Sequence, residues 1–139
     1  MISPADLTLA ELRHLSGDCR ANILIVGELS SSQRDEILQT LTLQRELDVF
    51  YAQRLNKFIL PSVGDVLLVV DDVCALSRHE QGRLLRWVSR HGAPVVSFAS
   101  GSPYSMVCDG RFVDRLYYHL NTICIVVSSD PQHQPPPHL

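Results

Sequence analysis

Two groups of polar residues, each directly after an apolar run, have the types and spacing to do chemistry. The first is Gly27–Arg34, in which serine hydroxyls precede the cation of Arg34. Hydroxyls and a guanidinium at the start of a helix could accept an anion. The second is the pair Asp71 and Asp72, which follows Val66–Val70. These two carboxylates either belong to such a site or only solvate the loop at the end of a buried strand.

Other common kinds of site are not indicated. The four cysteines include no CxxC pair, so reduced core thiols of a cytosolic protein are expected. The six histidines show no metal-ligand spacing on one element, so no metal site is predicted. No GxSxG elbow supports a hydrolase triad. The balance of 12 Lys and Arg against 15 Asp and Glu, without a basic run, disfavours direct nucleic-acid binding.

Five short apolar runs alternate with helical patterns along the chain. Most are continuous β-branched or aliphatic runs, typical of parallel strands that are buried on both faces. They are Ile23–Val26, Val49–Tyr51, Val66–Val70, Val95–Phe98 and Ile123–Val127. The alternation predicts right-handed crossovers and an open, mostly parallel sheet, with ligands at the carboxyl ends of its strands. A length of 139 residues and a hydrophobic content of 45% suit one domain of this kind.

The connecting segments carry helical signals. A helix is predicted over Ser31–Leu47, with Asp35 and Glu36 early in it, where acids suit the macrodipole. A short amphipathic helix is predicted over Arg111–Leu120. A further helix start is predicted at Ser3–Asp6. No signal peptide and no membrane span are indicated, and a cytoplasmic protein without membrane contact is expected.

One helix between two of the apolar runs carries both a start and a stop signal. Ser77 and Glu80 have the spacing of a capping box, which opens a helix. This helix should end at Gly92, because glycine readily adopts the left-handed conformation of a helix terminus. Its apolar face should pack on the sheet, with Trp87 at its flank.

Three segments carry a family resemblance. Asp109–Asn121 resembles the GRFREDLYYRLN segment, Asp65–Ser77 the Walker B stretch GTLFLDEIGELS, and Ile23–Glu28 the VLITGE segment of sigma-54-dependent activators, a clade of AAA+ ATPases also called bacterial enhancer-binding proteins. The resemblance implies a three-layer α/β sandwich of the P-loop NTPase type, with a five-stranded parallel sheet in the order 5-1-4-3-2. Residues 1–128 are expected to form this core in degenerate form, and 129–139 a disordered proline-rich tail.

The phosphate-binding loop of this family reads GxxxxGK followed by a hydroxyl residue, and this chain departs from it at three positions. Ser32 adds a side chain where the backbone must approach phosphate. Gln33 removes the cation that reaches the β- and γ-phosphates, and Arg34 cannot coordinate the Mg²⁺ ion held at its position in relatives. The degenerate nucleotide site that the resemblance implies comprises Gly27, Glu28, Ser30, Ser31, Ser32, Gln33, Arg34, Asp71 and Asp72.

The catalytic positions implied by the resemblance are altered as well. Asp71 is kept, but Asp72 is one methylene shorter than the glutamate with which relatives orient the attacking water. Val113 and His119 replace the two arginines with which a subunit completes its neighbour's site. Arginine fingers contribute about 10³ to 10⁵ in rate. Hydrolysis of ATP is therefore not expected.

Three further family features are changed. The sensor loop keeps only hydroxyls, at Ser100 and Ser102, where relatives carry an amide that senses the γ-phosphate. The chain between Gln33 and Asp71 is shorter than in relatives and has no GAFTGA loop to grip the sigma factor. No helical lid is expected after the fifth strand.

The leading functional hypothesis is a non-catalytic regulatory or interaction module of bacterial transcription control, without a cofactor. Its partner would be a sigma-54 activator, another transcription regulator or a second copy of the chain. The possible contact surface comprises Arg111, Phe112, Arg115, Tyr117 and Tyr118. The alternative for this helix is that Phe112, Leu116 and one tyrosine only pack on the sheet.

An active ATPase is the least favoured option, because several residues that hydrolysis needs are replaced. Two other classes of protein also have to be considered. The alternative is an atypical ATP or ADP sensor of a sigma-54-dependent regulator, with little or no hydrolysis, which would bind its nucleotide with Mg²⁺. A response-regulator receiver domain needs an acidic pair after its first strand, where only Glu28 stands, and a lysine after its fifth, where Ser128 and Ser129 stand. The receiver interpretation is therefore discarded.

Overall fold

The computed structural model describes residues 21–45, 47–92 and 94–127. Its centre is a parallel sheet of β1 (Ile23–Val26), β2 (Asp48–Tyr51), β5 (Val66–Val70), β6 (Val95–Ala99) and β7 (Ile123–Val126). The strands lie in the order β2-β5-β6-β1-β7, and every pairing is parallel. Numbered one to five along the chain, they have the predicted order 5-1-4-3-2.

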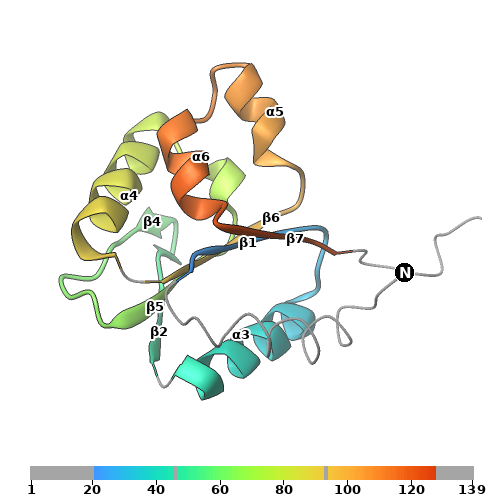
Figure 1. Ribbon diagram of the computed structural model, residues 1–139, viewed down its shortest axis with the longest axis vertical. Helices are drawn as coiled ribbons and strands as arrows, with labels where there is room; N and C mark the ends of the chain where they lie inside the picture. The colour runs from blue at the N-terminus through green and yellow to red at the C-terminus, as the bar shows by residue number, and fades with distance from the viewer. Residues whose placement is uncertain (1–20, 46, 93, 128–139) are drawn as a thin grey trace, which may run out of the picture.

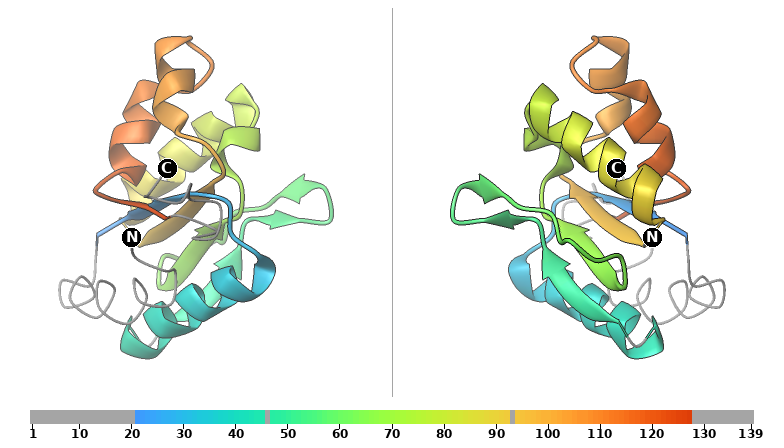
Figure 2. Two further views of the ribbon diagram at one scale, coloured as in Figure 1. Left: turned by 90° about the vertical axis from the view of Figure 1, so that its right-hand side faces the viewer. Right: turned by 90° about the vertical axis from the view of Figure 1, so that its left-hand side faces the viewer.

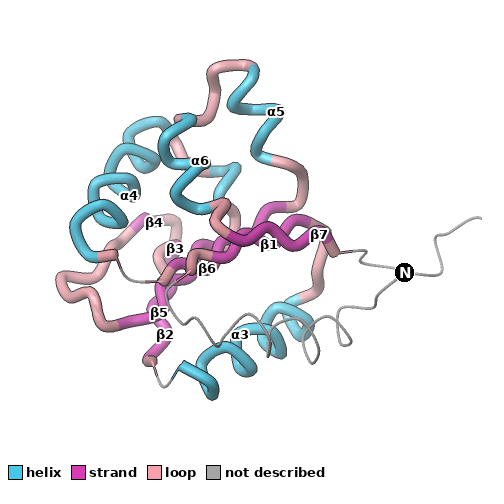
Figure 3. The backbone as a smooth tube through the Cα atoms, viewed as in Figure 1, coloured by secondary structure: helices cyan, strands magenta, loops and turns pink. Residues whose placement is uncertain are grey.

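Helices cover both faces of this sheet. They are α3 (Ser31–Arg45), η3 (Val73–Ala75), α4 (Arg78–His91), α5 (Pro103–Cys108) and α6 (Asp114–Leu120). Figure 1 shows α3 on one face and α4, α5 and α6 on the other, and Figure 3 shows the strands between these two helical layers. The predicted three-layer sandwich is therefore confirmed.

Alternate residues of the buried strands enter two separate apolar cores. On the α3 side, Ile37 and Leu41 pack with strand residues such as Val69. On the other side, Leu84 and Leu116 pack with strand residues such as Leu68. This double burial explains why the strands read as continuous apolar runs rather than as alternating patterns.

The capping box of α4 is formed as predicted. The Ser77 N–H donates to the Glu80 carboxylate at 2.8 Å, and the Glu80 N–H donates to the Ser77 hydroxyl at 3.1 Å. The helix ends at Gly92 in the left-handed conformation, with φ of 61°. The position of Trp87 was predicted wrongly. Its indole is only 6% exposed and belongs to the core rather than the flank, because its N–H finds a buried acceptor in the Pro61 carbonyl at 2.8 Å.

Two other helix predictions need correction. The segment predicted as helix over 111–120 becomes helical only at Asp114, and the extended Val113 precedes it. The first turn of α3 contains no acid, because Asp35 and Glu36 lie one turn further on. Helix α5 and the small hairpin of β3 (Gln53–Arg54) and β4 (Lys57–Phe58) were not predicted. Figure 2 shows this hairpin projecting from the body of the molecule.

Several sequence predictions fall on other parts of the chain. The opening helix, the proline-rich tail and Cys19 lie outside the described residues. Cys74, Cys108 and Cys124 are free thiols, but Cys108 and Cys124 are exposed and therefore not core residues as expected. Among the described helices, none is both long and apolar enough to cross a bilayer.

Candidate functional site

The loop after β1 starts at a glycine that the fold itself requires. Gly27 has φ of 149°, and its N–H donates to the Ala99 carbonyl at 2.8 Å. A Cβ atom at this position would lie 2.4 Å from the Val127 carbonyl oxygen, which is a backbone atom that cannot easily move. The close approach of the chain beyond β7 therefore explains Gly27 without any phosphate.

The first turn of α3 is capped by side chains of its own segment, Ser30 and Gln33. The Ser30 N–H donates to the Gln33 Oε1 at 2.8 Å, and the Gln33 N–H donates to the Ser30 hydroxyl at 3.2 Å. This reciprocal pair is a capping box, which uses amides that a phosphate-binding loop would offer to its ligand. The Ser32 and Ser30 hydroxyl oxygens are also within hydrogen-bond distance, at 3.1 Å. Gln33 was predicted only as a lost lysine, although the spacing of Ser30 and Gln33 is itself a capping signal.

Arg34 reaches from α3 across the ends of the neighbouring strands. Its Nη1 donates to the backbone carbonyl of Asp71 at 3.0 Å, and its guanidinium carbon lies 5.1 Å from the centre of the Phe98 ring. Its Nε is buried and has no hydrogen-bond partner among the described residues. The structure thus joins two residues that the sequence assigned to the two halves of a nucleotide site, and it joins them directly.

The carboxyl group of Asp71 lies in a partly desolvated place. Burial raises its pKa, the nearby Arg34 opposes this by lowering it, and Asp35 raises it again. The pKa of the neighbouring Tyr51 is raised, first by burial and then by the charges of Asp35 and Asp71. A hollow of about 300 Å³ beside these groups is lined by Ser31, Arg34, Asp35, Leu38, Tyr51 and Asp71. Its two carboxylates outnumber its one guanidinium, so its charge does not suit a triphosphate.

The backbone of Asp72 is hydrogen-bonded within the fold, whereas its carboxylate is exposed. The Asp72 N–H donates to the Gln53 Oε1, and the Gln53 Nε2 donates to the Asp72 carbonyl, both at 3.0 Å. The Asp72 side chain is exposed and does not cap the η3 turn. Gln53 was missed in the sequence because its role depends on the unpredicted β3–β4 hairpin.

The other residues predicted for the nucleotide site and its sensor are either exposed or cap a helix. Glu28 and Ser100 are exposed. Ser102 caps α5, since its hydroxyl accepts from the Tyr104 N–H at 3.3 Å. No cluster of three or more His, Cys, Asp or Glu side chains that could hold a metal ion occurs within residues 21–45, 47–92 and 94–127.

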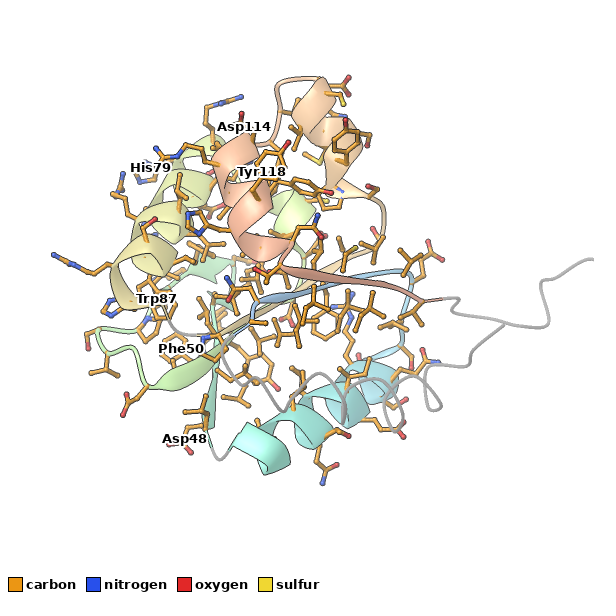
Figure 4. The ribbon with its side chains drawn as sticks, viewed as in Figure 1. Asp48, Phe50, His79, Trp87, Asp114 and Tyr118 are labelled. Carbon is orange, nitrogen blue, oxygen red and sulfur yellow. The ribbon has the colours of Figure 1, made fainter. Side chains whose placement is uncertain are left out.

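The predicted contact surface on α6 is partly formed. Arg115 and Tyr118 are exposed, and Figure 4 shows Tyr118 on α6. The Tyr117 ring is half-buried and lies 5.5 Å from the ring of Tyr118 and 5.9 Å from that of Tyr104. Phe112 was assigned wrongly to this surface, because its side chain is 3% exposed and packs in the core.

Arg111 completes the predicted surface residues, and its side chain is already paired. It is exposed and forms an ion pair of 3.0 Å with Asp109. An exposed pair of this kind contributes little to stability. Arg111 therefore remains available to a partner.

A buried glutamine fixes the loop that leads into α6. Gln81 is 1% exposed, and its Oε1 accepts from the Val113 N–H at 2.8 Å. Its Nε2 donates to the carbonyls of Leu76 and Arg111 at 3.1 and 3.2 Å. The Val113 position, which carries an arginine in the resembled family, is thus held by its backbone. The role of Gln81 was not predicted, because no local sequence pattern indicates a buried polar side chain.

Three solved structures of one protein, NtrX from Brucella abortus, are similar to this chain. The structure of NtrX from Brucella abortus in complex with ADP has a TM-score of 0.66, with 14% identity over 92% of this chain and 37% of that one. The complex with ATP has a TM-score of 0.67, with 15% identity over 87% of this chain and 35% of that one. A third NtrX structure has a TM-score of 0.64, with 15% identity over 87% of this chain and 37% of that one.

These likenesses establish the fold, which is that of the AAA+ P-loop NTPase core. The chain spans little more than a third of the length of the NtrX chains, since the largest share covered is 37%. No curated protein matches it. The family model described as the sigma-54 interaction domain matches residues 11–129. The chain therefore belongs to the sigma-54 interaction domain family.

Proposed function

We propose that this domain is a non-catalytic, cytoplasmic interaction module of bacterial sigma-54-dependent transcription control. The observation that carries the proposal is the closed start of α3, where Ser30 and Gln33 cap each other's backbone amides. The second support is Arg34, a cation of the chain itself, bonded to the strand end at Asp71.

The energetics of this loop oppose nucleotide binding. A triphosphate would have to displace the capping hydrogen bonds, and loss of a capping side chain costs about 1 kcal/mol. It would gain no ammonium contact at Gln33, and it would meet the charges of Asp35 and Asp71. Catalysis would also lack the arginine fingers, which are worth about 10³ to 10⁵ in rate.

The preserved part of the domain is suited to protein contacts. Tyr104 and Tyr118 are 53% and 66% exposed, and their ring centres lie 5.9 and 5.5 Å from that of the half-buried Tyr117. Arg115 adds a cation to the same surface, which we call the tyrosine surface. Tyrosine and arginine are enriched at protein interfaces and at their energetic centres. The proposed partner is an intact sigma-54 activator or a second copy of this chain.

Co-migration on size-exclusion chromatography tests this function. The domain is expected to form a mixed complex with a sigma-54 activator, or a dimer, at micromolar concentration. Tyr118→Ala and Arg115→Glu should weaken the complex about tenfold or more, as expected for interface hot spots. Leu55→Ala and Lys57→Glu, at exposed positions around the hairpin turn, are the matched controls. A domain that remains monomeric with every activator tested would contradict the proposal.

A second candidate function is an atypical ATP or ADP sensor. It is favoured by the shared fold with NtrX, whose structures include complexes with ADP and with ATP. Thermal denaturation with and without Mg²⁺-nucleotide separates the two candidates, because a ligand that binds the folded state raises the melting temperature by mass action. A clear rise with either nucleotide would favour the sensor over the interaction module.

A further inference from the structure

A cationic hollow lies on α4, away from the loops of the candidate site. Its volume is about 450 Å³ and its lining residues are Leu60, Arg83, Arg86, Trp87, Arg90 and His91. Helix α4 leaves the carboxyl end of β5 and leads to the amino end of β6, so its last turns lie at the opposite end of the sheet from the start of α3. Figure 4 shows Trp87 in this part of α4, near the loop that leads to β5.

The three arginines of the hollow form one stripe on the helix surface. Their spacing of three and four residues brings Arg83, Arg86 and Arg90 onto the same face. Arg83 is committed within the fold, since its Nη1 donates to the Phe58 carbonyl at 2.9 Å and its guanidinium lies 5.5 Å from the Phe58 ring centre. Arg86 and Arg90 are exposed and form no ion pair or side-chain hydrogen bond within the described part of the chain. Two guanidinium groups are therefore available to a ligand.

The floor of the hollow is apolar. The Trp87 indole is anchored by its hydrogen bond to the Pro61 carbonyl, and its ring centre lies 4.8 Å from that of His91. Leu60 is half-buried, lines the same hollow as Trp87, and packs against the core that contains Leu84 and Leu116. The apolar surface of Leu60 and Trp87 thus lies among three arginines, one bonded within the fold and two that form no side-chain hydrogen bond to a residue that the structure describes. Groups that are already in place for a ligand lower the entropic cost of binding it.

We propose that this hollow docks an acidic amphipathic segment of a partner protein. One aliphatic or aromatic side chain of the segment would cover Leu60 and the edge of Trp87, while flanking carboxylates pair with Arg86 and Arg90. Arginine binds carboxylates through two parallel hydrogen bonds, so the charges and the shape of the two partners are complementary. The inference goes beyond the proposed function, because it concerns a different surface and is independent of the state of the nucleotide loop.

Nucleic acid is the less suitable occupant. Duplex DNA is typically held by about six to ten phosphate contacts, whereas the hollow offers two free arginines on a chain with a net charge of −3. The apolar floor would also gain nothing from a phosphate backbone. A short DNA duplex is therefore a useful negative probe.

Selection of displayed peptides that bind the full chain, followed by fluorescence titration of each selected peptide, tests the proposal. Random peptides of about 15 residues, long enough for a helix, would be selected and then titrated while the emission of Trp87 is followed. Trp87 is the chain's one tryptophan, so a change in its emission reports on this hollow. Selected peptides are expected to carry acidic residues around an apolar anchor, to alter the Trp87 emission, and to bind more weakly at high salt.

Substitutions then decide between this site and other surfaces. Arg86→Gln and Arg90→Gln should each weaken binding about tenfold, because each removes a guanidinium that would form charge-assisted hydrogen bonds to a carboxylate of the peptide. Lys57→Gln removes the same charge from the exposed hairpin and should leave binding unchanged. Selection of no acidic peptides, equal binding by all variants, or a Trp87 response only to DNA would overturn the proposal.

Discussion

The guanidinium of Arg34 donates a hydrogen bond to the backbone carbonyl of Asp71, with a nitrogen–oxygen distance of 3.0 Å. In the resembled ATPases these two positions cooperate around a Mg²⁺ ion, one through a hydroxyl and the other through its carboxylate. In this chain the positive charge next to Asp71 is the guanidinium of Arg34. The two halves of the ancestral site are thus joined by the chain's own groups.

Asp71→Asn is expected to raise the melting temperature slightly at neutral pH. The pKa of Asp71 is raised in the folded state, chiefly by burial, so its charged form weakens the fold above that pKa. As the pH falls through the raised pKa toward the ordinary value of 3.8, the native carboxyl becomes protonated and the advantage of the variant disappears. Thermal denaturation between neutral and acidic pH measures this, with Asp48→Asn at the exposed start of β2 as control. An advantage that persisted at the acidic end would contradict the burial argument.

Ser30→Ala is expected to lower the free energy of unfolding by about 1 kcal/mol. The reason is the loss of the hydroxyl that accepts from the Gln33 N–H. Ser31→Ala, at the exposed neighbouring position, should change stability by no more than about 0.5 kcal/mol. Urea denaturation of the ligand-free protein measures both. Equal stability of the two variants would show that the capping box contributes nothing.

Gly27→Ala is expected to destabilise the fold by about 2 kcal/mol or more, through backbone strain and steric conflict. The added methyl group would meet the Val127 carbonyl oxygen, and φ of 149° is unfavourable for alanine. At Gly101 an added Cβ would have no atom within 4 Å, so Gly101→Ala is the control and should be nearly neutral. Urea denaturation again gives the comparison. A neutral Gly27→Ala variant would remove the structural explanation for this glycine.

Gln81→Leu is expected to cost at least about 3 kcal/mol, because each of three groups that lose their hydrogen bond costs about 1–3 kcal/mol. The affected groups are the Val113 N–H and the carbonyls of Leu76 and Arg111. Amide hydrogen exchange should show early loss of protection at Val113, while Gln39→Leu on the exposed side of α3 should leave it unchanged. Retained protection at Val113 in the Gln81 variant would contradict the assigned role.

The fold was predictable because its determinants are local or periodic. The buried strand Val66–Val70 is a continuous apolar run, and the helix between Ser77 and Gly92 carries its own start and stop signals. Helix α5 and the β3–β4 hairpin were missed because they are short and lack such a period. The burial of Trp87 depends on an acceptor distant in sequence, at Pro61.

The candidate site was only partly predictable. The sequence identified which family residues had been replaced, but it did not indicate what the replacements do. Gln33 caps a helix, Gln53 holds the backbone of Asp72, and Gln81 holds that of Val113. The last two roles join residues far apart in the chain, so only the folded arrangement reveals them. Phe112 is buried next to Val113, whose backbone Gln81 holds.

Isothermal titration calorimetry of the chain with Mg²⁺-ATP measures directly whether the loop after β1 still binds nucleotide. The closed start of α3 and the cation of Arg34 predict no binding heat up to about 1 mM nucleotide, a concentration at which a ligand with micromolar affinity would saturate the site. Saturable binding at micromolar concentration, followed by phosphate release that Asp71→Ala abolishes, would contradict the account.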